Sequence, residues 1–239
     1  MELTHSVEAL QTRLDEVRGR IELSARRGGR SPADVTLIAV SKTHPTEALS
    51  RALSAGLSDF GENRVQEAES KIEELKEARA NWHLIGHLQS NKARRAAKLF
   101  DCIHTLDTVA LAERLERACA EEGRDELRVL IQVDLGGEST KSGVPEDEVP
   151  TIVETIHAYR HLKFVGLMTL PPFLEDPDRV RPYFRRLREM RDDLRARGVF
   201  KMGEGELSMG MSHDYEVAVE EGSTMVRVGT AIFGARDTV

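Results

Sequence analysis

The sequence predicts an α/β fold in which eight parallel strands alternate with helices and close into a barrel. Short apolar runs rich in β-branched residues recur along the 239 residues, and amphipathic helical patterns separate them. No long linker interrupts this alternation. An open doubly wound sheet is the alternative, but no predicted strand is followed by a G-x-G-x-x-G turn. We therefore expect a (β/α)8 barrel of the TIM type.

The eight predicted strands extend over most of the chain. In chain order they are 35–41, 59–62, 82–87, 102–107, 127–135, 162–170, 206–210 and 225–234. Apolar residues at helical spacing mark the helices between them, as in 149–156 and 178–198. Glu67 and Lys71 form an i, i+4 pair on the helix after the second strand. An additional helix precedes the first strand, with one apolar side made of Val7, Leu10, Leu14, Val17 and Ile21.

The composition fits one sizeable domain, because 40% of the residues are hydrophobic and no compositional shift divides residues 1–239. A net charge of −7 argues against general binding to nucleic acid. Two cysteines, Cys102 and Cys119, are too few for a disulfide framework or a zinc site. The first residues lack the features of a signal peptide, and no apolar run reaches the length of a membrane span. We expect a cytoplasmic protein.

Lys42 is the first candidate for chemistry, because it follows directly on the first predicted strand. In barrels of this kind the functional face lies at the C-terminal ends of the strands. Partial desolvation there lowers the pKa of a lysine, and a neutral amine attacks aldehydes to form a Schiff base. An ordinary surface lysine at a strand end is the alternative interpretation.

Small polar residues follow the seventh and eighth predicted strands. Gly229 and Thr230 offer backbone N–H groups and a hydroxyl to a phosphate, although a glycine at this place can also mark a bend at a barrel corner. Ser208 and Ser212 belong to the seventh strand and the turn after it, where Ser212 could instead cap the next helix. Together these strand ends indicate a lysine facing an anion site across the barrel mouth.

Other polar residues carry weaker signals. His83 and His87 lie four apart on a strand, not on a helix, so we interpret them as core or rim histidines and not as zinc ligands. Cys102 and His104 have no oxyanion motif nearby, which weakens them as a catalytic dyad. Asn63 ends the second strand and either orients a ring substituent or caps the following helix.

Longer motifs carry a family resemblance. The segments AVSKTHP, FGENRVQE, WHLIGHLQSNK, GLMTL, LSMGMSHD and GSTMVRVGTAIFG resemble the signature of the pyridoxal-phosphate homeostasis protein family. The resemblance runs from about residue 5 to the C-terminus. It implies a barrel like the N-terminal domain of alanine racemase, which is fold type III among pyridoxal 5′-phosphate (PLP) proteins, with PLP as the cofactor.

The resemblance also implies roles for individual residues. Lys42 would form the Schiff base, and Arg227 would lie near the ring nitrogen or the phosphate. The phosphate cradle would consist of Ser208, Ser212, Gly229 and Thr230, and the ring would be bordered by Asn63 and Met168. This sequence departs from the family pattern at His44, where many bacterial relatives carry a second lysine. Lys141 matches the family and is a candidate for a secondary, transient amine.

The implied function is that of a carrier, which buffers PLP or delivers it to apo-enzymes in vitamin B6 homeostasis and has no established reaction. A positive Arg227 beside the ring nitrogen disfavours ring protonation and so weakens the ring as an electron sink. Alanine racemases add a C-terminal β-domain that supplies dimer contacts, so its loss favours a monomer here.

Two enzymatic functions remain as alternatives. A racemase-like enzyme needs a second base, and Tyr159, Tyr183 and Tyr215 lie in predicted helices, where none is an obvious one. In a class I aldolase-type barrel the lysine would attack substrate directly, but that lysine is usually on a later strand.

Overall fold

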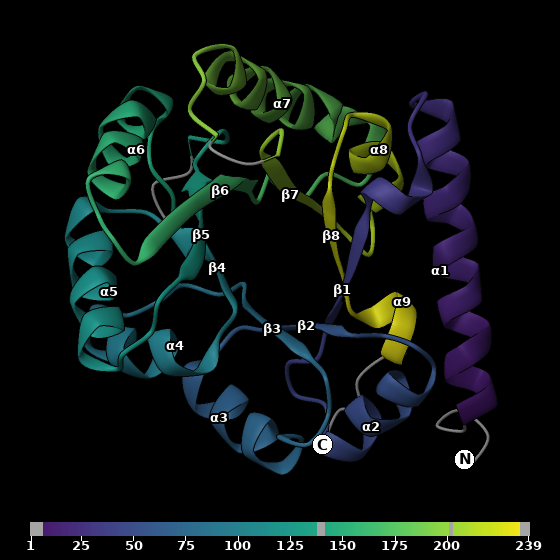
Figure 1. The fold of residues 1–239 in the computed structure, drawn as a ribbon. Helices are drawn as coiled ribbons and strands as arrows, with labels where there is room; N and C mark the ends of the chain where they lie inside the picture. The colour runs from purple at the N-terminus through teal and green to yellow at the C-terminus, as the bar shows by residue number, and fades with distance from the viewer. Residues whose placement is uncertain (1–6, 138–141, 201–202, 235–239) are drawn as a thin grey trace.

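The computed structural model describes residues 7–137, 142–200 and 203–234. Within these residues, eight parallel strands form a closed barrel in which neighbours follow chain order and β8 pairs with β1. Figure 1 shows the strands as an inner ring with the helices outside it. The predicted (β/α)8 barrel with an additional N-terminal helix is confirmed.

The strands lie close to their predicted positions. They are β1 (Thr36–Val40), β2 (Asp59–Glu62), β3 (Asn81–Leu84), β4 (Cys102–Leu106), β5 (Leu127–Val133), β6 (Leu162–Thr169), β7 (Glu206–Met211) and β8 (Met225–Val228). The helices are α1 (Val7–Arg27), α2 (Thr46–Ser54), α3 (Val65–Glu74), α4 (Ala93–Leu99), α5 (Val109–Glu121), α6 (Val149–His157), α7 (Arg181–Ala196), α8 (Tyr215–Glu220) and α9 (Thr230–Phe233).

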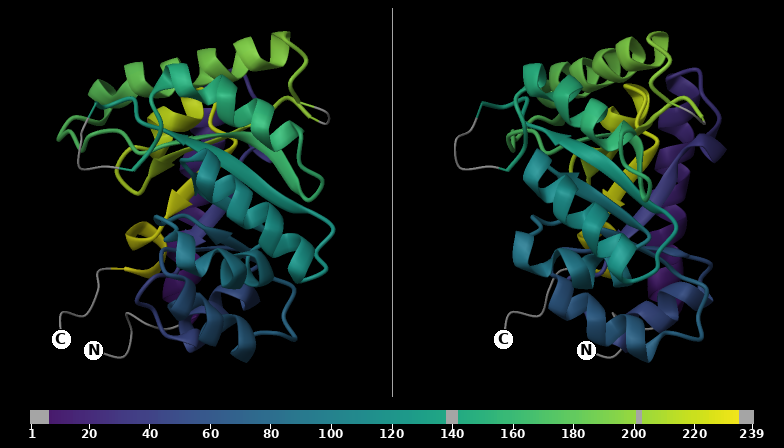
Figure 2. Two further views of the ribbon diagram at one scale, coloured as in Figure 1. Left: turned by 90° about the vertical axis from the view of Figure 1, so that its left-hand side faces the viewer. Right: turned by 60° about the vertical axis from the view of Figure 1, so that its left-hand side comes forward.

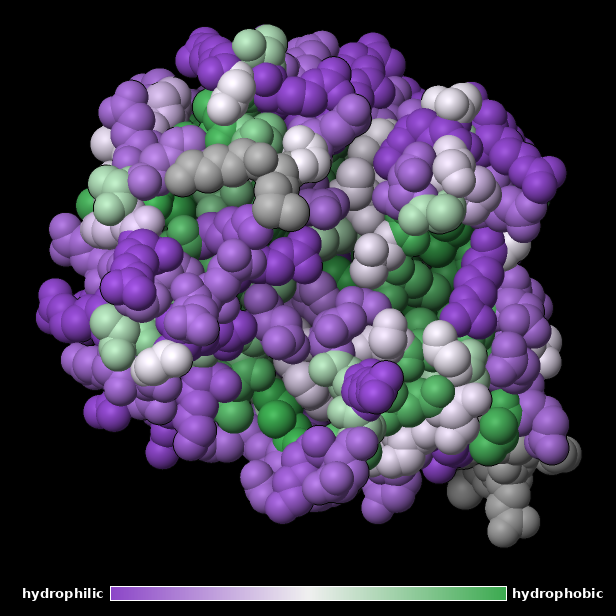
Figure 3. Space-filling model, viewed as in Figure 1, coloured by the Kyte–Doolittle hydropathy of each residue, from purple (hydrophilic) through white to green (hydrophobic). Residues whose placement is uncertain are grey.

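Short 3-10 turns complete the described secondary structure, at Pro32–Asp34, Ser90–Lys92, Glu146–Glu148 and Pro177–Val180. The side views of Figure 2 show α5 and α6 lying over the outer surface of the strands. Hydrophilic residues cover most of the face drawn in Figure 3. Among the described residues, no helix combines the length and the apolar character that crossing a bilayer requires.

Two apolar regions stabilise the barrel, because successive strand residues point alternately outward and inward. The larger region lies between the strands and the helices. The smaller one, inside the barrel, contains Cys102, Leu130 and Met168. Polar side chains that include His83 and His104 are also buried within the fold. Buried polar groups need hydrogen-bond partners, so the positions of these side chains are specified more tightly than apolar packing alone would require.

The last predicted strand, 225–234, is too long. The structure ends β8 at Val228, and Thr230–Phe233 form one helical turn, α9. The apolar run that follows Gly229 cannot be assigned to strand or helix by periodicity alone. The expectation that Tyr159 lies in a helix is also wrong, because α6 ends at His157.

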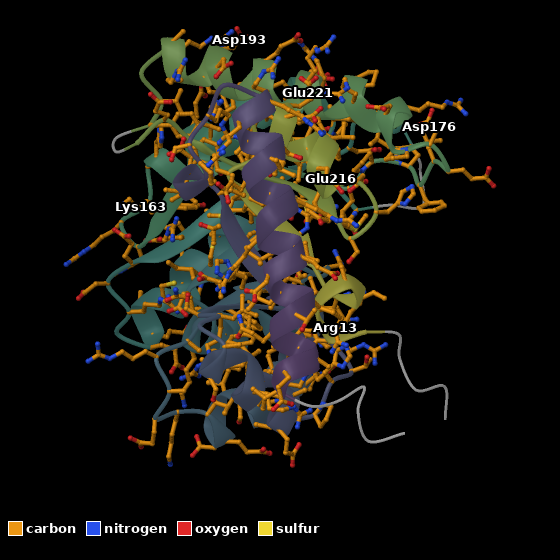
Figure 4. The ribbon with its side chains drawn as sticks, turned by 90° about the vertical axis from the view of Figure 1, so that its right-hand side faces the viewer. Arg13, Lys163, Asp176, Asp193, Glu216 and Glu221 are labelled. Carbon is orange, nitrogen blue, oxygen red and sulfur yellow. The ribbon has the colours of Figure 1, made fainter. Side chains whose placement is uncertain are left out.

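Helix α1 buries Leu10, Leu14, Val17 and Ile21 of the predicted apolar side and packs against α8 and α9. Val7, which was also predicted to lie on that side, is 47% exposed. The Nε of Arg13 donates a hydrogen bond to the Ile232 carbonyl in α9, at 2.7 Å. An ion pair of 3.1 Å joins Arg20 to Glu216 in α8. Figure 4 shows α1 along the outside of the barrel, with α9 beside Arg13. Helix α1 therefore fixes the segment that follows β8.

Candidate functional site

The C-terminal ends of the eight strands meet at one end of the barrel, because all strand pairs are parallel. Lys42, Asn63, Ser212 and Thr230 follow β1, β2, β7 and β8, respectively, within two residues. The structure thus brings the sequence-predicted residues from distant parts of the chain to the same rim. That rim is where barrels of this kind carry their functional sites.

Lys42 lies two residues beyond the end of β1, and its side chain is half-buried. Strand β1 pairs with β8 through Ala39 and Val228. A Cβ atom added at Gly229 would lie 3.3 Å from both the Cβ and the carbonyl oxygen of Val40. Gly229 is therefore in close contact with the end of β1, and the turn that carries Lys42 lies beside the turn that follows β8.

The turn that carries Lys42 has a strained backbone. Thr43 has a φ of 65°, in the left-handed region that β-branched residues avoid. Such a conformation costs on the order of 1–3 kcal/mol and persists only where surrounding contacts enforce it. Here the Thr43 N–H donates to the carboxylate of Glu67, and the His44 N–H donates to the Ser41 carbonyl at 3.1 Å. These contacts hold the turn in one shape.

A buried network of charged residues also holds the turn that carries Lys42. The Lys71 ammonium donates to the Ser41 carbonyl at 2.7 Å, to Glu62 at 2.7 Å and to Glu67 at 2.8 Å. The Ser41 hydroxyl donates to the same Glu62 oxygen at 2.7 Å. Burial raises the pKa of Glu62, although the hydrogen bonds from Lys71 and Ser41 act against it. The predicted Glu67–Lys71 pair is confirmed, but the sequence did not reveal that Lys71 is buried.

Ser212 interacts with the end of β8 instead of capping α8. Its Oγ accepts a hydrogen bond from the Gly229 N–H at 3.2 Å. Asp214 occupies the N-cap position of α8 and accepts a hydrogen bond from the Met211 N–H at 2.6 Å. The alternative interpretation, in which Ser212 caps this helix, is therefore wrong. Ser212, Gly229 and Thr230 form one small polar group at the start of α9, where Gly229 occupies the N-cap position.

Arg227 lies in β8, two residues before Gly229, and is only 3% exposed. Its Nη1 donates to the Ser208 hydroxyl at 2.5 Å, and its Nη2 donates to the Thr169 carbonyl at 3.0 Å. Burial lowers the pKa of Arg227 to about 10, with the charge of Asp214 acting against the shift. The guanidinium is still charged at neutral pH. The Ser208 hydroxyl lies between Arg227 and His104, at 2.8 Å from the latter, which is a different setting from the phosphate cradle expected for it.

Asn63 and Met168 occupy different environments. Asn63 does not cap α3, whose N-cap is Arg64, and it lines a cavity of about 450 Å³ together with Gly86 and Lys92. A Cβ at Gly86 would lie 2.4 Å from the Asn63 carbonyl oxygen, so only glycine fits there. Met168 is fully buried inside the barrel, where it is register partner to Ser208.

The remaining candidates are placed as follows. The His44 ring lies 4.6 Å from the Phe233 ring, so the position where relatives carry a lysine packs against α9. Lys141 lies outside the described residues. His83 is buried and hydrogen-bonded at both ring nitrogens, as expected of a core histidine, whereas the His87 side chain is 55% exposed.

The residues at this rim fit a small phosphorylated aldehyde. The half-buried amine of Lys42 lies on a turn that hydrogen bonds hold in place, and hydroxyl and N–H donors of Ser212 and Gly229 lie beside that turn. Arg227, two residues before Gly229, adds a buried positive charge. Donors of this kind bind phosphate, and the amine suits a carbonyl carbon.

Comparisons with known proteins agree with this chemistry. Residues 13–237 match the family described as alanine racemase, N-terminal domain. A pyridoxal phosphate homeostasis protein from Aquifex aeolicus is 43% identical over 224 residues, which cover 94% of this chain and 97% of that protein. The structure of PipY from Synechococcus elongatus with PLP bound has a TM-score of 0.82 and 38% identity, covering 94% of this chain and 100% of that one.

Alanine racemase from Corynebacterium glutamicum shares the fold alone, at 20% identity and a TM-score of 0.64. The match covers 92% of this chain but 60% of the racemase. The homeostasis proteins, by contrast, are matched over nearly their whole length. This chain belongs to the pyridoxal phosphate homeostasis protein family, within the wider family of alanine racemase N-terminal domains.

Proposed function

We propose that this protein binds PLP at the rim of the barrel, as a reversible Schiff base on Lys42, and buffers or delivers it in vitamin B6 homeostasis. The observation that carries the proposal is the contact between the Lys42 turn and the turn after β8, where Gly229 packs against Val40. An amine and an anion site are thereby held on adjacent strands.

The residues at the rim have separate roles in PLP binding. Bound PLP supplies an aldehyde that a neutral lysine converts reversibly into a Schiff base. Ser212, Gly229 and Thr230 bind the phosphate through hydroxyl and backbone donors. Asn63 and Met168 border the ring. Ser208 is better suited to positioning Arg227 than to binding phosphate, because its hydroxyl contacts both Arg227 and His104.

Arg227 supports a carrier over an enzyme. A guanidinium beside the ring nitrogen disfavours protonation of the ring, on which many decarboxylases and transaminases rely. The Aquifex aeolicus relative, which is matched over nearly its whole length, is named as a homeostasis protein and not as an enzyme. We propose that the chain acts without catalytic turnover, as a monomeric, single-domain, cytoplasmic protein that passes PLP to apo-enzymes.

The first experiment locates the bound cofactor. PLP added to the protein should give an absorbance band near the visible edge, and borohydride reduction should fix PLP on the peptide that contains Lys42. Both signals should vanish in Lys42→Ala and persist in Lys92→Ala, which removes a half-buried lysine from the neighbouring cavity. Fixation of PLP on another lysine in the wild type would refute the assignment.

A second experiment separates the carrier from a racemase. The wild type should restore activity to an apo PLP enzyme, whereas Lys42→Ala should not. Tyr183 lies in α7, and Tyr215 lies in α8 with 4% exposure, so neither stands at a strand end as an opposing base. Fast racemisation of alanine by the purified protein would overturn the carrier function.

A further inference from the structure

A continuous row of hydrogen-bonded side chains crosses the interior of the barrel. Asp59 Oδ1 lies 3.1 Å from His83 Nε2, and His83 Nδ1 lies 2.9 Å from His104 Nε2. His104 Nδ1 lies 2.8 Å from Ser208 Oγ, which accepts from Arg227 at 2.5 Å. The five residues come from β2, β3, β4, β7 and β8. We call this row the Asp59–Arg227 chain.

The two ends of the chain fix its direction. Arg227 can only donate, and an ionised carboxylate can only accept. Burial acts to raise the pKa of Asp59, but hydrogen bonds from His83, Ser58 and Asn81 outweigh it and lower that pKa. Asp59 is therefore the accepting end.

With both ends fixed, one assignment keeps both imidazoles neutral and gives the Ser208 proton an acceptor. Ser208 accepts from Arg227 and donates its proton to Nδ1 of His104. His104 then donates from Nε2 to Nδ1 of His83, which donates from Nε2 to Asp59. Burial holds the pKa of His104 well below 6.5, and the positive charges of Arg227 and Arg128 add to the effect. Both imidazoles carry their proton on Nε2.

The alternative use of these side chains is a metal site, since ligand atoms of His83, Cys102 and His104 lie within 4.8 Å of one another. Two observations favour the hydrogen-bonded chain. The facing imidazole nitrogens are already in hydrogen-bond contact. In addition, burial raises the pKa of Cys102 to about 12, which makes the thiolate that a metal requires costly to form.

The chain joins opposite ends of the barrel. Asp59 is the first residue of β2 and lines a cavity of about 430 Å³ together with Arg18 and Leu37. Arg227 is near the C-terminal end of β8, one residue before Val228. The intervening side chains thus connect Asp59 to Arg227 by direct hydrogen bonds.

We propose that Asp59, His83, His104 and Ser208 are positioning residues that set the orientation of Arg227 toward the cofactor ring. The inference rests on the proposed function, because it places the PLP ring beside Arg227. Each residue of the Asp59–Arg227 chain fixes the proton position of the next residue. The Asp59 carboxylate selects the Nε2–H form of His83, and that form selects the same form of His104. The unprotonated Nδ1 of His104 accepts a hydrogen bond from the Ser208 hydroxyl. The lone pairs of the Ser208 oxygen are then left to accept from Arg227.

Nitrogen NMR of the imidazole rings tests the chain in protein free of PLP, so this result does not depend on the proposed function. Both His83 and His104 should be neutral with the proton on Nε2 at pH 7. Asp59→Ala should move His83 to a mixture of tautomers. Ser58→Ala leaves Asp59 Oδ1 in place and should keep the wild-type spectrum, as should Cys102→Ala, which alters the interior outside the chain.

A cationic His83 or an Nδ1–H form of His104 in the wild type would overturn the proposal. So would stoichiometric binding of Zn²⁺ that is lost in Cys102→Ala. If Asp59→Ala fails to fold, Asp59→Leu provides the comparison, because its side chain occupies similar space without an acceptor oxygen. An unchanged His83 tautomer in the Leu variant would also count against the proposal.

The second measurement uses PLP-loaded protein. Asp59→Ala should shift the absorbance maximum of bound PLP and raise its Kd by about 5-fold, the effect of one misplaced hydrogen bond. Ser58→Ala and Cys102→Ala should change neither value. If the tautomers change while the spectrum and Kd stay as in the wild type, the link to the cofactor is refuted. If the wild type binds no PLP, the proposed function fails while the tautomer result still stands.

Discussion

The Lys71 ammonium lies 2.7 Å from the carbonyl oxygen of Ser41, the residue that precedes Lys42. This contact joins the third helix to the end of the first strand, next to the amine on which the proposed function depends. The same ammonium neutralises Glu62, which is fully buried and has one carboxylate oxygen, Oε2, without a hydrogen-bond partner among the described residues.

Replacing Lys71 should destabilise the fold strongly. Lys71→Met leaves Glu62 buried without its counter-charge, and the loss of one partner from such a pair costs about 3–5 kcal/mol. Urea unfolding followed by circular dichroism measures the change. Lys76→Met is the matched control, because it removes an exposed pair with Glu73 and should cost less than about 1 kcal/mol.

Glu62→Gln in the Lys71→Met protein should recover part of that stability, because it removes the unpaired charge. Equal losses in Lys71→Met and Lys76→Met would contradict the burial of the network. A double variant no more stable than Lys71→Met alone would show that the lost contact to Ser41, and not the charge, dominates.

Gly229→Ala should weaken phosphate binding. The new methyl group would meet Val40 at 3.3 Å, so either β1 or the turn after β8 must shift by a few tenths of an ångström. We expect the Kd for PLP to rise by about 5-fold, or about 1 kcal/mol, as measured by absorbance titration. Gly19→Ala is the matched control. It lies within α1 with no atom within 4 Å of the new group, and it should stabilise the protein by about 0.5–1 kcal/mol with no change in Kd.

Arg13→Ala should loosen α9 and with it the donors of the proposed phosphate site. The hydrogen bond from Arg13 to the Ile232 carbonyl involves a charged donor, so its loss costs about 1.5–3 kcal/mol at most. Hydrogen exchange should rise in α9, and the Kd for PLP should increase. Arg20→Ala, from the same helix, removes only a partly exposed pair and should leave both quantities unchanged. Similar behaviour of the two variants would argue against a role of α1 at the site.

Stability should fall as the pH drops below about 6.5, the usual pKa of an imidazole. His104 has a folded-state pKa well below that value, so between the two pKa values the unfolded chain binds a proton that the folded chain excludes. The free energy of unfolding then decreases by up to about 1.4 kcal/mol per pH unit. The depressed carboxyl pKa values of Asp59 and Glu221 act at lower pH, below about 4 to 4.5.

Unfolding curves at pH 7.5, 6.5 and 5.5 give the slope for the wild type and for His104→Gln. The variant should be less stable at pH 7.5 but should show a flatter slope between 6.5 and 5.5. An unchanged slope would mean that another group takes up the proton in this range.

The sequence predicts the barrel because each β/α unit is encoded locally, by a short apolar run and an amphipathic helix. Lys42 and Gly229 were found for the same reason, since parallel strands place their C-terminal ends on one rim. The burial of Lys71 could not be predicted from the sequence. A lysine four residues after a glutamate reads as a surface pair, and only the packing of α3 on β2 shows that it is buried.

The interior polar row was missed for a different reason. His83 and His104 belong to separate strands, and the strand register that brings them together is a property of the closed sheet. Ser212 illustrates a third limit. Ser212 was a candidate cap for α8, but its hydroxyl oxygen accepts from the N–H of Gly229, which arrives from the next strand, and Asp214 takes the N-cap position.

The closure of the barrel between its first and last strands has a consequence for biogenesis. Lys42 is synthesised early, and the proposed phosphate donors Gly229 and Thr230 are synthesised late. A nascent or truncated chain therefore lacks a complete PLP site. A ligand that binds only the native state stabilises it in proportion to the logarithm of its concentration over Kd. PLP supplied during refolding should therefore stabilise only those chains in which β8 has docked onto β1.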